Sequence, residues 1–439
     1  MEKLSDEQYY EEINKGAEGP VDETANEEMQ QALRSMETFE GALTPEERES
    51  ETFHNLQKAA DTVIKCFQMK PRENLVIITD EGVPQIVRTA FIETANAAVG
   101  EDLRVMVSRT PTDLGQPFES AAIAEKIGSA SKVLYLTSKS RSHSKETKEE
   151  VMVPLSENQR TAELQNRRHK ERGSMVPGKA SLFSITRANN IELLTTGAAL
   201  EDVEKMWERQ DGFLKIFKSA KKVHITTEKG TDIIINVKPG TISKESGQLG
   251  KQGMVANFPF GEVECAPSWE GTNGVFVVDG VGGKAGATTN NGYLKEPIKV
   301  YIENGRAVKM EGGKEAKEFW QYLTDQQAKY EQEHPGEKGS VFVLAELGIG
   351  MNAAAFRMNE QGEKILPPTQ LEAEKAMGTC HLALGNNSLM VGMGGYGNHD
   401  SEYNYAPIHT DQVIRDVTME IETEDGETIK IMEAGKFLT

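Results

Sequence analysis

The chain has 439 residues, and its 49 Lys and Arg against 69 Asp and Glu give a formal net charge of −20 at pH 7. A net acidic surface disfavours nucleic acids and anionic membrane surfaces as partners, because both present dense negative charge. Three scattered cysteines, no apolar stretch of about 18 residues and no basic-then-apolar N-terminal signal lead us to expect a cytoplasmic protein.

The N-terminal part of the chain is strongly acidic. Residues 1–60 contain 16 acidic and 5 basic side chains, which is −11 of the total charge, and few large apolar residues occur before Leu33. Such a composition cannot bury much apolar surface. We therefore predict an acidic extension over residues 1–54 that is partly disordered or helical.

Residues 55–220 follow an α/β pattern. Apolar strand patterns at 75–79, 103–107 and 132–137 alternate with helical patterns at 56–67, 84–99 and 119–127. This alternation predicts a mostly parallel sheet with helical crossovers. Residues 139–179, rich in charge and interrupted by proline and glycine, predict a long insertion, after which a strand at 181–186 and a helix at 200–217 complete the domain.

Residues 221–439 show a different pattern, which predicts an α+β domain rich in antiparallel hairpins. Turn residues join three pairs of strand patterns, and a helical pattern occupies 314–333. The strand pairs are 222–227 with 232–237, 298–302 with 307–310, and 417–422 with 428–432. We place the domain boundary near residue 220.

Candidate metal ligands occur in short, glycine-rich segments of this second domain. His409 and Asp411 are two positions apart, so on an extended chain both side chains point to the same face and can converge on one ion. Two histidines with three carboxylates exceed what one divalent ion needs and suit two ions that share a carboxylate. The five candidates are Glu262, Glu346, His381, His409 and Asp411.

The segments around these candidates carry a family resemblance. They are Asn257-Phe258-Pro259-Phe260-Gly261-Glu262-Val263, Glu346-Leu347-Gly348-Ile349-Gly350, Gly378-Thr379-Cys380-His381-Leu382-Ala383-Leu384-Gly385 and Ile408-His409-Thr410-Asp411. Together they resemble the thermophilic metalloaminopeptidase family that includes aminopeptidase T and aminopeptidase S. The resemblance covers roughly residues 55–435 and leaves out the acidic extension.

The resemblance implies a two-domain homodimeric hydrolase that releases N-terminal residues from short peptides. Two divalent ions (zinc, cobalt or manganese) would bind at the five candidates, with Glu262 as the bridging carboxylate and Glu262, Glu346 or His143 available for proton transfer. One position departs from that family, whose members carry a tyrosine seven residues after the His381 equivalent, where this chain has Ser388.

A second interpretation is a ring-cleaving dioxygenase. Dihydroxypyridine dioxygenases are similar to the same family and use one Fe(II), and His381, His409 and Asp411 form the two-histidine, one-carboxylate set of such iron enzymes. His143 would then be similar to a histidine proposed as the base toward the ring hydroxyl. Retention of both Glu262 and Glu346 favours the dinuclear hydrolase, which is our main expectation, over the dioxygenase.

Two other interpretations rank lower. One is a metal-stabilised dimer without catalytic activity. The other is nucleotide binding at residues 392–397, which spell G-x-G-x-x-G; however, a turn-rich segment follows them instead of the helix that a dinucleotide fingerprint requires. We therefore expect a small-molecule or short-peptide substrate.

Overall fold

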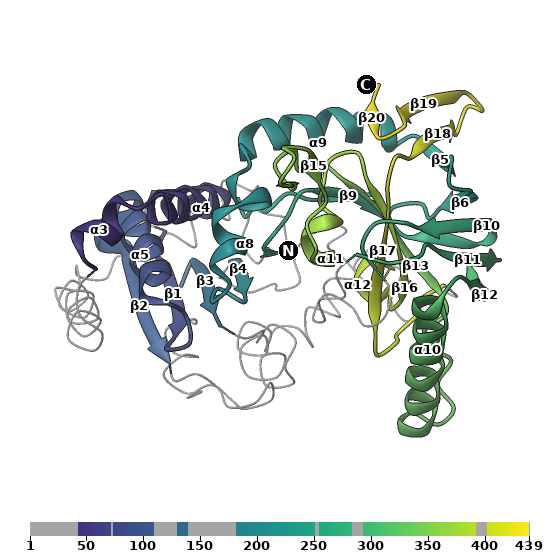
Figure 1. The fold of residues 1–439 in the computed structure, drawn as a ribbon, viewed down its shortest axis with the longest axis horizontal. Helices are drawn as coiled ribbons and strands as arrows, with labels where there is room; N and C mark the ends of the chain where they lie inside the picture. The colour runs from purple at the N-terminus through teal and green to yellow at the C-terminus, as the bar shows by residue number, and fades with distance from the viewer. Residues whose placement is uncertain are drawn as a thin grey trace, which may run out of the picture.

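The structure is a computed structural model, and it describes residues 43–71, 73–108, 130–138, 181–250, 254–282, 293–391 and 402–438. A five-stranded parallel sheet with its helices forms one part of the fold, and two antiparallel sheets of eight and five strands form the other (Figure 1). This arrangement confirms the predicted fold class. In the described ranges, no helix combines the length and apolarity needed to cross a membrane.

The first sheet contains five strands, and every neighbouring pair is parallel. Three of its strands, at 75–80, 132–137 and 181–186, carry the apolar runs that the sequence pattern identified. The described side chains of these three strands are buried on both faces of the sheet. The spatial order is β2 (Leu103–Ser108), β1 (Leu75–Asp80), β3 (Lys132–Thr137), β4 (Ser181–Thr186) and β8 (Val255–Asn257).

Helices cover this sheet and supply the rest of its core. In α4 (Glu51–Phe67), which the Ser50 side chain caps, Leu56 and Phe67 are fully buried, as is Phe91 in α5 (Gln85–Val99). The remaining short and long helices are α3 (Pro45–Glu49), η1 (Gly100–Asp102), α8 (Ile191–Thr195), η3 (Gly197–Leu200) and α9 (Val203–Phe217). The predicted helix at 119–127, the insertion at 139–179 and the segment 392–397 lie outside the described residues.

The first sheet takes its last strand from beyond the predicted boundary near residue 220. Strand β8 pairs with β4, and Phe258 and Phe260, which follow it directly, pack in the first core. The chain has already contributed β5 (Ala220–Thr226), β6 (Asp232–Val237) and β7 (Ser243–Glu245) to the second domain, and it returns to that domain at Gly261 and Glu262. A single boundary near residue 220 therefore leaves one strand of the first sheet on the wrong side, because periodicity cannot show which sheet a three-residue strand joins.

The second domain packs an eight-stranded antiparallel sheet against a five-stranded one. The larger sheet contains the three predicted hairpins, β5–β6, β11–β12 and β18–β19, each of which is confirmed. Its order is β12 (Arg306–Glu311), β11 (Ile298–Glu303), β10 (Pro267–Val278), β6 (Asp232–Val237), β5 (Ala220–Thr226), β18 (Thr418–Thr423), β19 (Thr428–Glu433) and β20 (Lys436–Phe437).

The five-stranded sheet carries the candidate ligands. Its order is β17 (His409–Ile414), β16 (Cys380–Gly385), β13 (Leu344–Gly350), β9 (Glu262–Cys265) and β7 (Ser243–Glu245). A two-stranded sheet, β14 (Arg357–Met358) with β15 (Lys364–Ile365), and the helices α10 (Lys314–Glu333), α11 (Gln370–Ala373) and α12 (Ser388–Val391) complete the domain. Helix α10 has the predicted bounds and projects from one end of the domain (Figure 1).

Side-chain alternation gives the five-stranded sheet one apolar and one polar face. Val263, Leu347 and Leu382 are fully buried in the core that also includes Val223, Ile235 and other residues of the larger sheet. The residues that alternate with them, such as Glu262, Glu346 and His381, point to the opposite face. The core between the two sheets therefore fixes the strands that present the ligands.

Candidate metal centre

Strand register brings residues from four strands together on the polar face. Glu346 on β13 lies opposite Ala383 on β16, and Ala383 lies opposite Asp411 on β17. His381 lies opposite Gly348, and Glu262 lies opposite Gly350. Small residues thus separate the acidic and imidazole side chains across the sheet, and the His381 ring occupies the position of a side chain at Gly348.

One group of potential ligands consists of Glu262, Glu346 and His381, all of which are buried. The Nε2 atom of His381 lies 3.3 Å from Oε1 of Glu346 and 3.4 Å from Oε2 of Glu262. That Glu262 oxygen has no hydrogen-bond partner among the described residues, although it is buried. A buried carboxylate oxygen without a donor is unfavourable unless a cation compensates it.

A second group consists of Glu346, His409 and Asp411. The Nε2 atom of His409 lies 3.1 Å from Oε2 of Glu346 and 3.2 Å from Oδ1 of Asp411. The His409 side chain is 35% exposed, whereas those of Glu346 and Asp411 are 8% and 11% exposed. Solvent, and hence a ligand, therefore reaches the centre from the His409 side.

Glu346 belongs to both groups. Its Oε1 faces His381 and its Oε2 faces His409, so the two histidines lie on either side of one carboxylate. The resemblance implied Glu262 as the shared carboxylate, but in this geometry the shared residue is Glu346. The set His381, His409 and Asp411 is more spread, since Nε2 of His381 lies 4.0 Å from Oδ1 of Asp411.

Neighbouring groups hold the ligands in orientations suited to metal binding. The backbone oxygen of Asn386 lies 2.7 Å from Nδ1 of His409, which leaves Nε2 to face the carboxylates. Gln370 on α11 donates from Nε2 to Oδ2 of Asp411 at 3.1 Å. Hydrogen bonds of this kind fix the tautomer and the direction of metal ligands. The donor set of nitrogen and oxygen atoms therefore fits a divalent transition metal.

A buried lysine lies next to the first group. The Nζ atom of Lys375 lies 2.5 Å from Oε1 of Glu262, 2.7 Å from Oε2 of Glu245 and 3.2 Å from Oε1 of Glu374. The side chains of Lys375 and Glu374 are each 5% exposed. The sequence analysis missed both residues because Glu372-Ala373-Glu374-Lys375 has the composition of a solvated helix end.

The dense packing of charge shifts the pKa values of these groups in opposite directions. Burial lowers the pKa of His409, but the nearby Asp411 and Glu346 outweigh it and raise that pKa well above its usual value. Burial raises the pKa of Glu374 to about 8, and Lys375 only partly opposes this rise. For Glu346, hydrogen bonds from His381 and His409 outweigh burial and lower the pKa. The carboxylates of Glu346 and Asp411 thus raise the pKa values of both His381 and His409 and favour their protonated forms.

Two residues from the sequence analysis cannot be placed at the centre. His143 lies outside the described residues. Ser388 is the first residue of α12, which follows β16 after a two-residue connection, and its side chain is likewise outside the part of the chain that the structure describes. Of the candidate site residues, the structure therefore brings together Glu262, Glu346, His381, His409 and Asp411.

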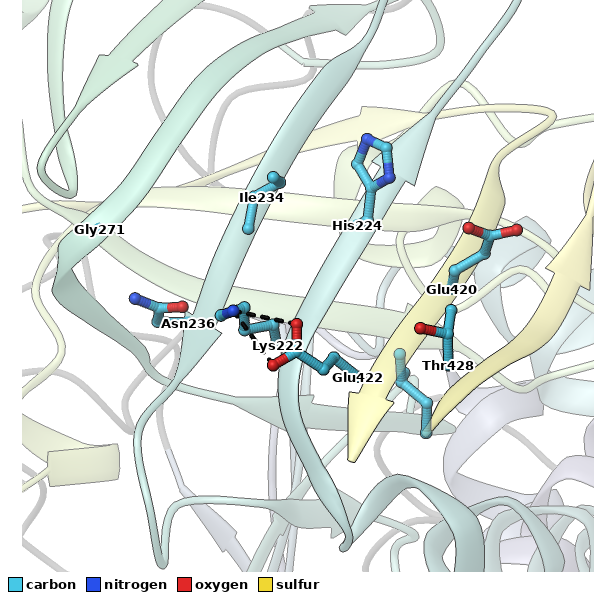
Figure 2. Close-up of a pocket in the computed structure, with 9 residues that line it drawn as sticks. Lys222, His224, Ile234, Asn236, Gly271, Glu420, Glu422 and Thr428 are labelled. Atoms are coloured by element: carbon cyan, nitrogen blue, oxygen red, sulfur yellow. Dashed lines mark hydrogen bonds and ion pairs between the residues drawn. The ribbon is translucent and has the colours of Figure 1, made fainter. Parts of the chain in front are cut away.

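A separate pocket of about 510 Å³ lies on the eight-stranded sheet, on strands that carry none of the ligands (Figure 2). Lys222 from β5 and Glu422 from β18 form an ion pair across its floor at 2.9 Å, and His224 contacts Asp232 at 2.8 Å. Each of these charged groups already has a partner, so the pocket offers no convergent set of free donors. We assign the site to the five-stranded sheet.

The fold and this centre together define a two-domain protein that carries a cluster of histidine and carboxylate side chains able to hold a metal ion. A comparison with protein-family models matches residues 185–438, more than half of the chain, to the family of 2,5-dihydroxypyridine 5,6-dioxygenase (NicX). The chain belongs to this family. The matched region contains all five candidate ligands.

Two solved structures share the fold. The 2,5-dihydroxypyridine dioxygenase of Pseudomonas putida KT2440 has a TM-score of 0.58 and 16% sequence identity, with 88% of this chain and 97% of that chain covered. AmpT from Thermus thermophilus has a TM-score of 0.53 and 15% identity, with 88% and 99% covered. A search of curated proteins found no match. Both families inferred from the sequence motifs, aminopeptidase T and the dihydroxypyridine dioxygenases, thus reappear as structural neighbours.

Proposed function

We propose that this chain is a metal-dependent ring-cleaving dioxygenase that acts on a hydroxylated pyridine or related aromatic ring. The observation that carries the proposal is the family match over residues 185–438, because it spans the whole candidate centre. The proposal reverses the order of our two sequence-based interpretations, in which the aminopeptidase came first.

The dioxygenase interpretation of the sequence placed the iron at His381, His409 and Asp411; we instead propose the second ligand group as the position of a single Fe(II), because its three ligand atoms lie closer together. Glu346, His409 and Asp411 would hold it, and His381 would support Glu346 from the other side. A bound Fe(II) ion would supply the redox chemistry with O2 and polarise a ring hydroxyl. The chain contributes orientation, since Gln370 and the Asn386 carbonyl fix Asp411 and His409, and the partly exposed His409 marks the side from which a flat substrate enters.

One observation supports a second candidate function, an aminopeptidase-type hydrolase with two divalent ions. Two ligand groups that share one carboxylate, Glu346, are typical of dinuclear hydrolases, in which the shared group and a water bridge the ions. Zinc, cobalt or manganese would then be bound, and short peptides would be the substrates. The fold similarity to AmpT is compatible with this alternative.

Metal analysis and two activity assays distinguish these functions. Protein purified without chelator is analysed for metal, then reconstituted anaerobically with Fe(II) and mixed with 2,5-dihydroxypyridine while O2 uptake is recorded. In parallel, zinc-, cobalt- or manganese-loaded protein is incubated with short peptides. Substrate-dependent O2 uptake supports the dioxygenase, whereas peptide cleavage without O2 uptake contradicts it.

Two variants sharpen the comparison. Asp411→Asn removes a ligand of the proposed iron position and is expected to abolish O2 uptake. Glu262→Gln leaves Glu346, His409 and Asp411 intact, so a mononuclear enzyme is expected to keep its iron and most of its activity. Loss of both metal and activity in Glu262→Gln would favour the dinuclear hydrolase.

The remaining expectations concern the setting of the reaction. We propose a cytoplasmic homodimer with a small-molecule substrate, on the basis of the composition and the family resemblance. Light scattering of the purified protein measures the oligomeric state. His143 remains the proposed base toward the ring hydroxyl, and His143→Ala is expected to slow O2 uptake without removing iron.

A further inference from the structure

A buried ammonium group lies beside one of the two ligand groups. The Nζ atom of Lys375 donates hydrogen bonds to the carboxylates of Glu262 at 2.5 Å and Glu245 at 2.7 Å, and it forms an ion pair with Glu374 at 3.2 Å. Its side chain is 5% exposed. Three carboxylates therefore surround one buried ammonium group.

The two ligand groups differ in whether a lysine or arginine side chain pairs with their carboxylates. Within the described ranges, no Lys or Arg lies within ion-pair distance of Glu346 or Asp411, whose ionic partners are His381 and His409. Glu262, in contrast, already has the Lys375 ammonium on Oε1. One ligand group therefore has a permanent cation of the chain, and the other has only imidazoles, which can release their protons to a metal.

We propose that Lys375 is a built-in cation that takes the place of a second metal ion beside Glu262 and limits the centre to one tightly bound divalent ion. This inference rests on the proposed single-ion function and extends it to the residue that sets the metal count. Lys375 acts through Glu262 as a positioning residue, since the structure gives it no direct contact with the second group.

The physical reason is charge repulsion at a buried site. A divalent ion bound by Glu262, Glu346 and His381 would approach an ammonium that already shares Glu262, and like charges repel strongly where water is excluded. An ion at Glu346, His409 and Asp411 meets no such group among the described residues. The lysine thus neutralises Glu262 and disfavours the first position, while the second position remains available.

The test is the number of metal ions per chain. Metal-free protein is equilibrated with excess Co(II), unbound metal is removed on a desalting column, and the bound cobalt is measured together with the visible absorption spectrum. We expect one ion for the wild type and two for Lys375→Met, whose second ion adds its own absorption bands. Lys375→Arg keeps the positive charge and is expected to bind one ion.

Lys238→Met is the matched control. Lys238 is also buried and pairs with Glu402 at 2.6 Å, but it belongs to neither ligand group. We expect it to bind one ion, so an extra ion in Lys375→Met cannot be attributed to loss of a buried lysine in general.

Two results would overturn the inference: two tightly bound ions in the wild type, or a single ion in a folded Lys375→Met. If Lys375→Met does not fold, Glu262→Gln provides the second test. This variant removes the carboxylate that Lys375 neutralises, and we expect it to keep one bound ion. Loss of that ion would contradict the inference. These counts need no substrate. Failure of the ring-cleavage assay with one bound ion would therefore reject the proposed function alone.

Discussion

The imidazole of His381 lies directly against the backbone of Gly348. A Cβ atom placed on Gly348 would lie 2.1 Å from the Nε2 and Cε1 atoms of that ring. The two residues are register partners on β16 and β13, and the missing side chain allows the ring to lie across β13 toward Glu346. The glycine in the segment Glu346-Leu347-Gly348 is therefore needed for the observed position of the His381 ring at the candidate centre.

Substitution Gly348→Ala is expected to displace His381 and weaken metal binding by at least about 10-fold, with a loss of about 1–3 kcal/mol in the free energy of unfolding. Cobalt titration and urea unfolding measure the two effects. Gly212→Ala is the control, because Gly212 lies inside α9 with open space where a Cβ atom would be, and alanine there stabilises helices by about 1 kcal/mol. Unchanged cobalt affinity in Gly348→Ala would contradict this role.

Substitution Glu346→Gln is expected to be more damaging than Glu262→Gln. Glu346 contacts both histidines and belongs to both ligand groups, so its neutral analogue weakens every potential metal position. We expect metal affinity to fall by more than about 100-fold, beyond the range typical of supporting residues. Calorimetric titration with Co(II) of both variants measures the difference, and equal losses would argue against a central role for Glu346.

Gln370 is expected to support Asp411 without binding the metal. Its amide donates to Oδ2 of Asp411 at 3.1 Å, so Gln370→Ala frees that carboxylate to rotate. Removal of such a partner typically lowers metal affinity about 10–100-fold. Gln370→Glu provides the comparison, because it keeps the size of the side chain but replaces the donor with an acceptor. If both variants bind Co(II) like the wild type, Asp411 is held by other contacts.

The stability of the metal-free protein is expected to fall as the pH rises toward 8. Burial raises the pKa of Glu374 to about 8 in the folded state, above the ordinary value of 4.5. Between pH 4.5 and pH 8, Glu374 is therefore protonated to a greater extent in the folded state than in the unfolded state. The free energy of unfolding then decreases with pH across this window, by up to about 1.4 kcal/mol per pH unit, and levels off above it. The side chain of Glu374→Gln cannot ionise, so the free energy of unfolding of this variant, measured with urea, should decrease less between pH 5.5 and 7.5 than that of the wild type. The same pH dependence in both proteins would exclude Glu374 as the cause of the decrease.

A buried ion pair joins the second domain to η3. Arg357 binds Glu372 through both of its terminal nitrogens at 2.7 Å, and Glu372, which is fully buried, accepts a hydrogen bond from the backbone N–H of Ala198. Glu372→Ala removes the fully buried partner of Arg357, whose side chain is itself only 15% exposed, and should cost about 3–5 kcal/mol in urea unfolding. Glu192→Ala removes an exposed partner of the same arginine and should cost less than about 1 kcal/mol. Similar losses of free energy of unfolding in the two variants would contradict the expectation that the buried ion pair stabilises the fold more than the exposed one.

Local patterns were sufficient to predict most of the secondary structure. Alternation and turn residues identified the three hairpins of the larger sheet, and helical spacing gave the bounds of α10. Strand β8 was missed because its three residues carry no periodicity and join the first sheet only through pairing with β4. Lys375 was missed for a related reason: its three carboxylate partners include Glu245 and Glu262, which lie more than a hundred residues earlier in the chain.

The sequence by itself determined the chemical types of the ligands and the strands that carry them. Five histidine and carboxylate side chains in glycine-rich strand segments are local features, visible without any knowledge of pairing. The tertiary structure decided how these ligands are grouped, since the strand register places Glu346 between His381 and His409 and the fold brings Lys375 to Glu262. The physical reason is that metal stoichiometry depends on distances between charges in a buried space, and contacts between strands far apart in the chain set those distances.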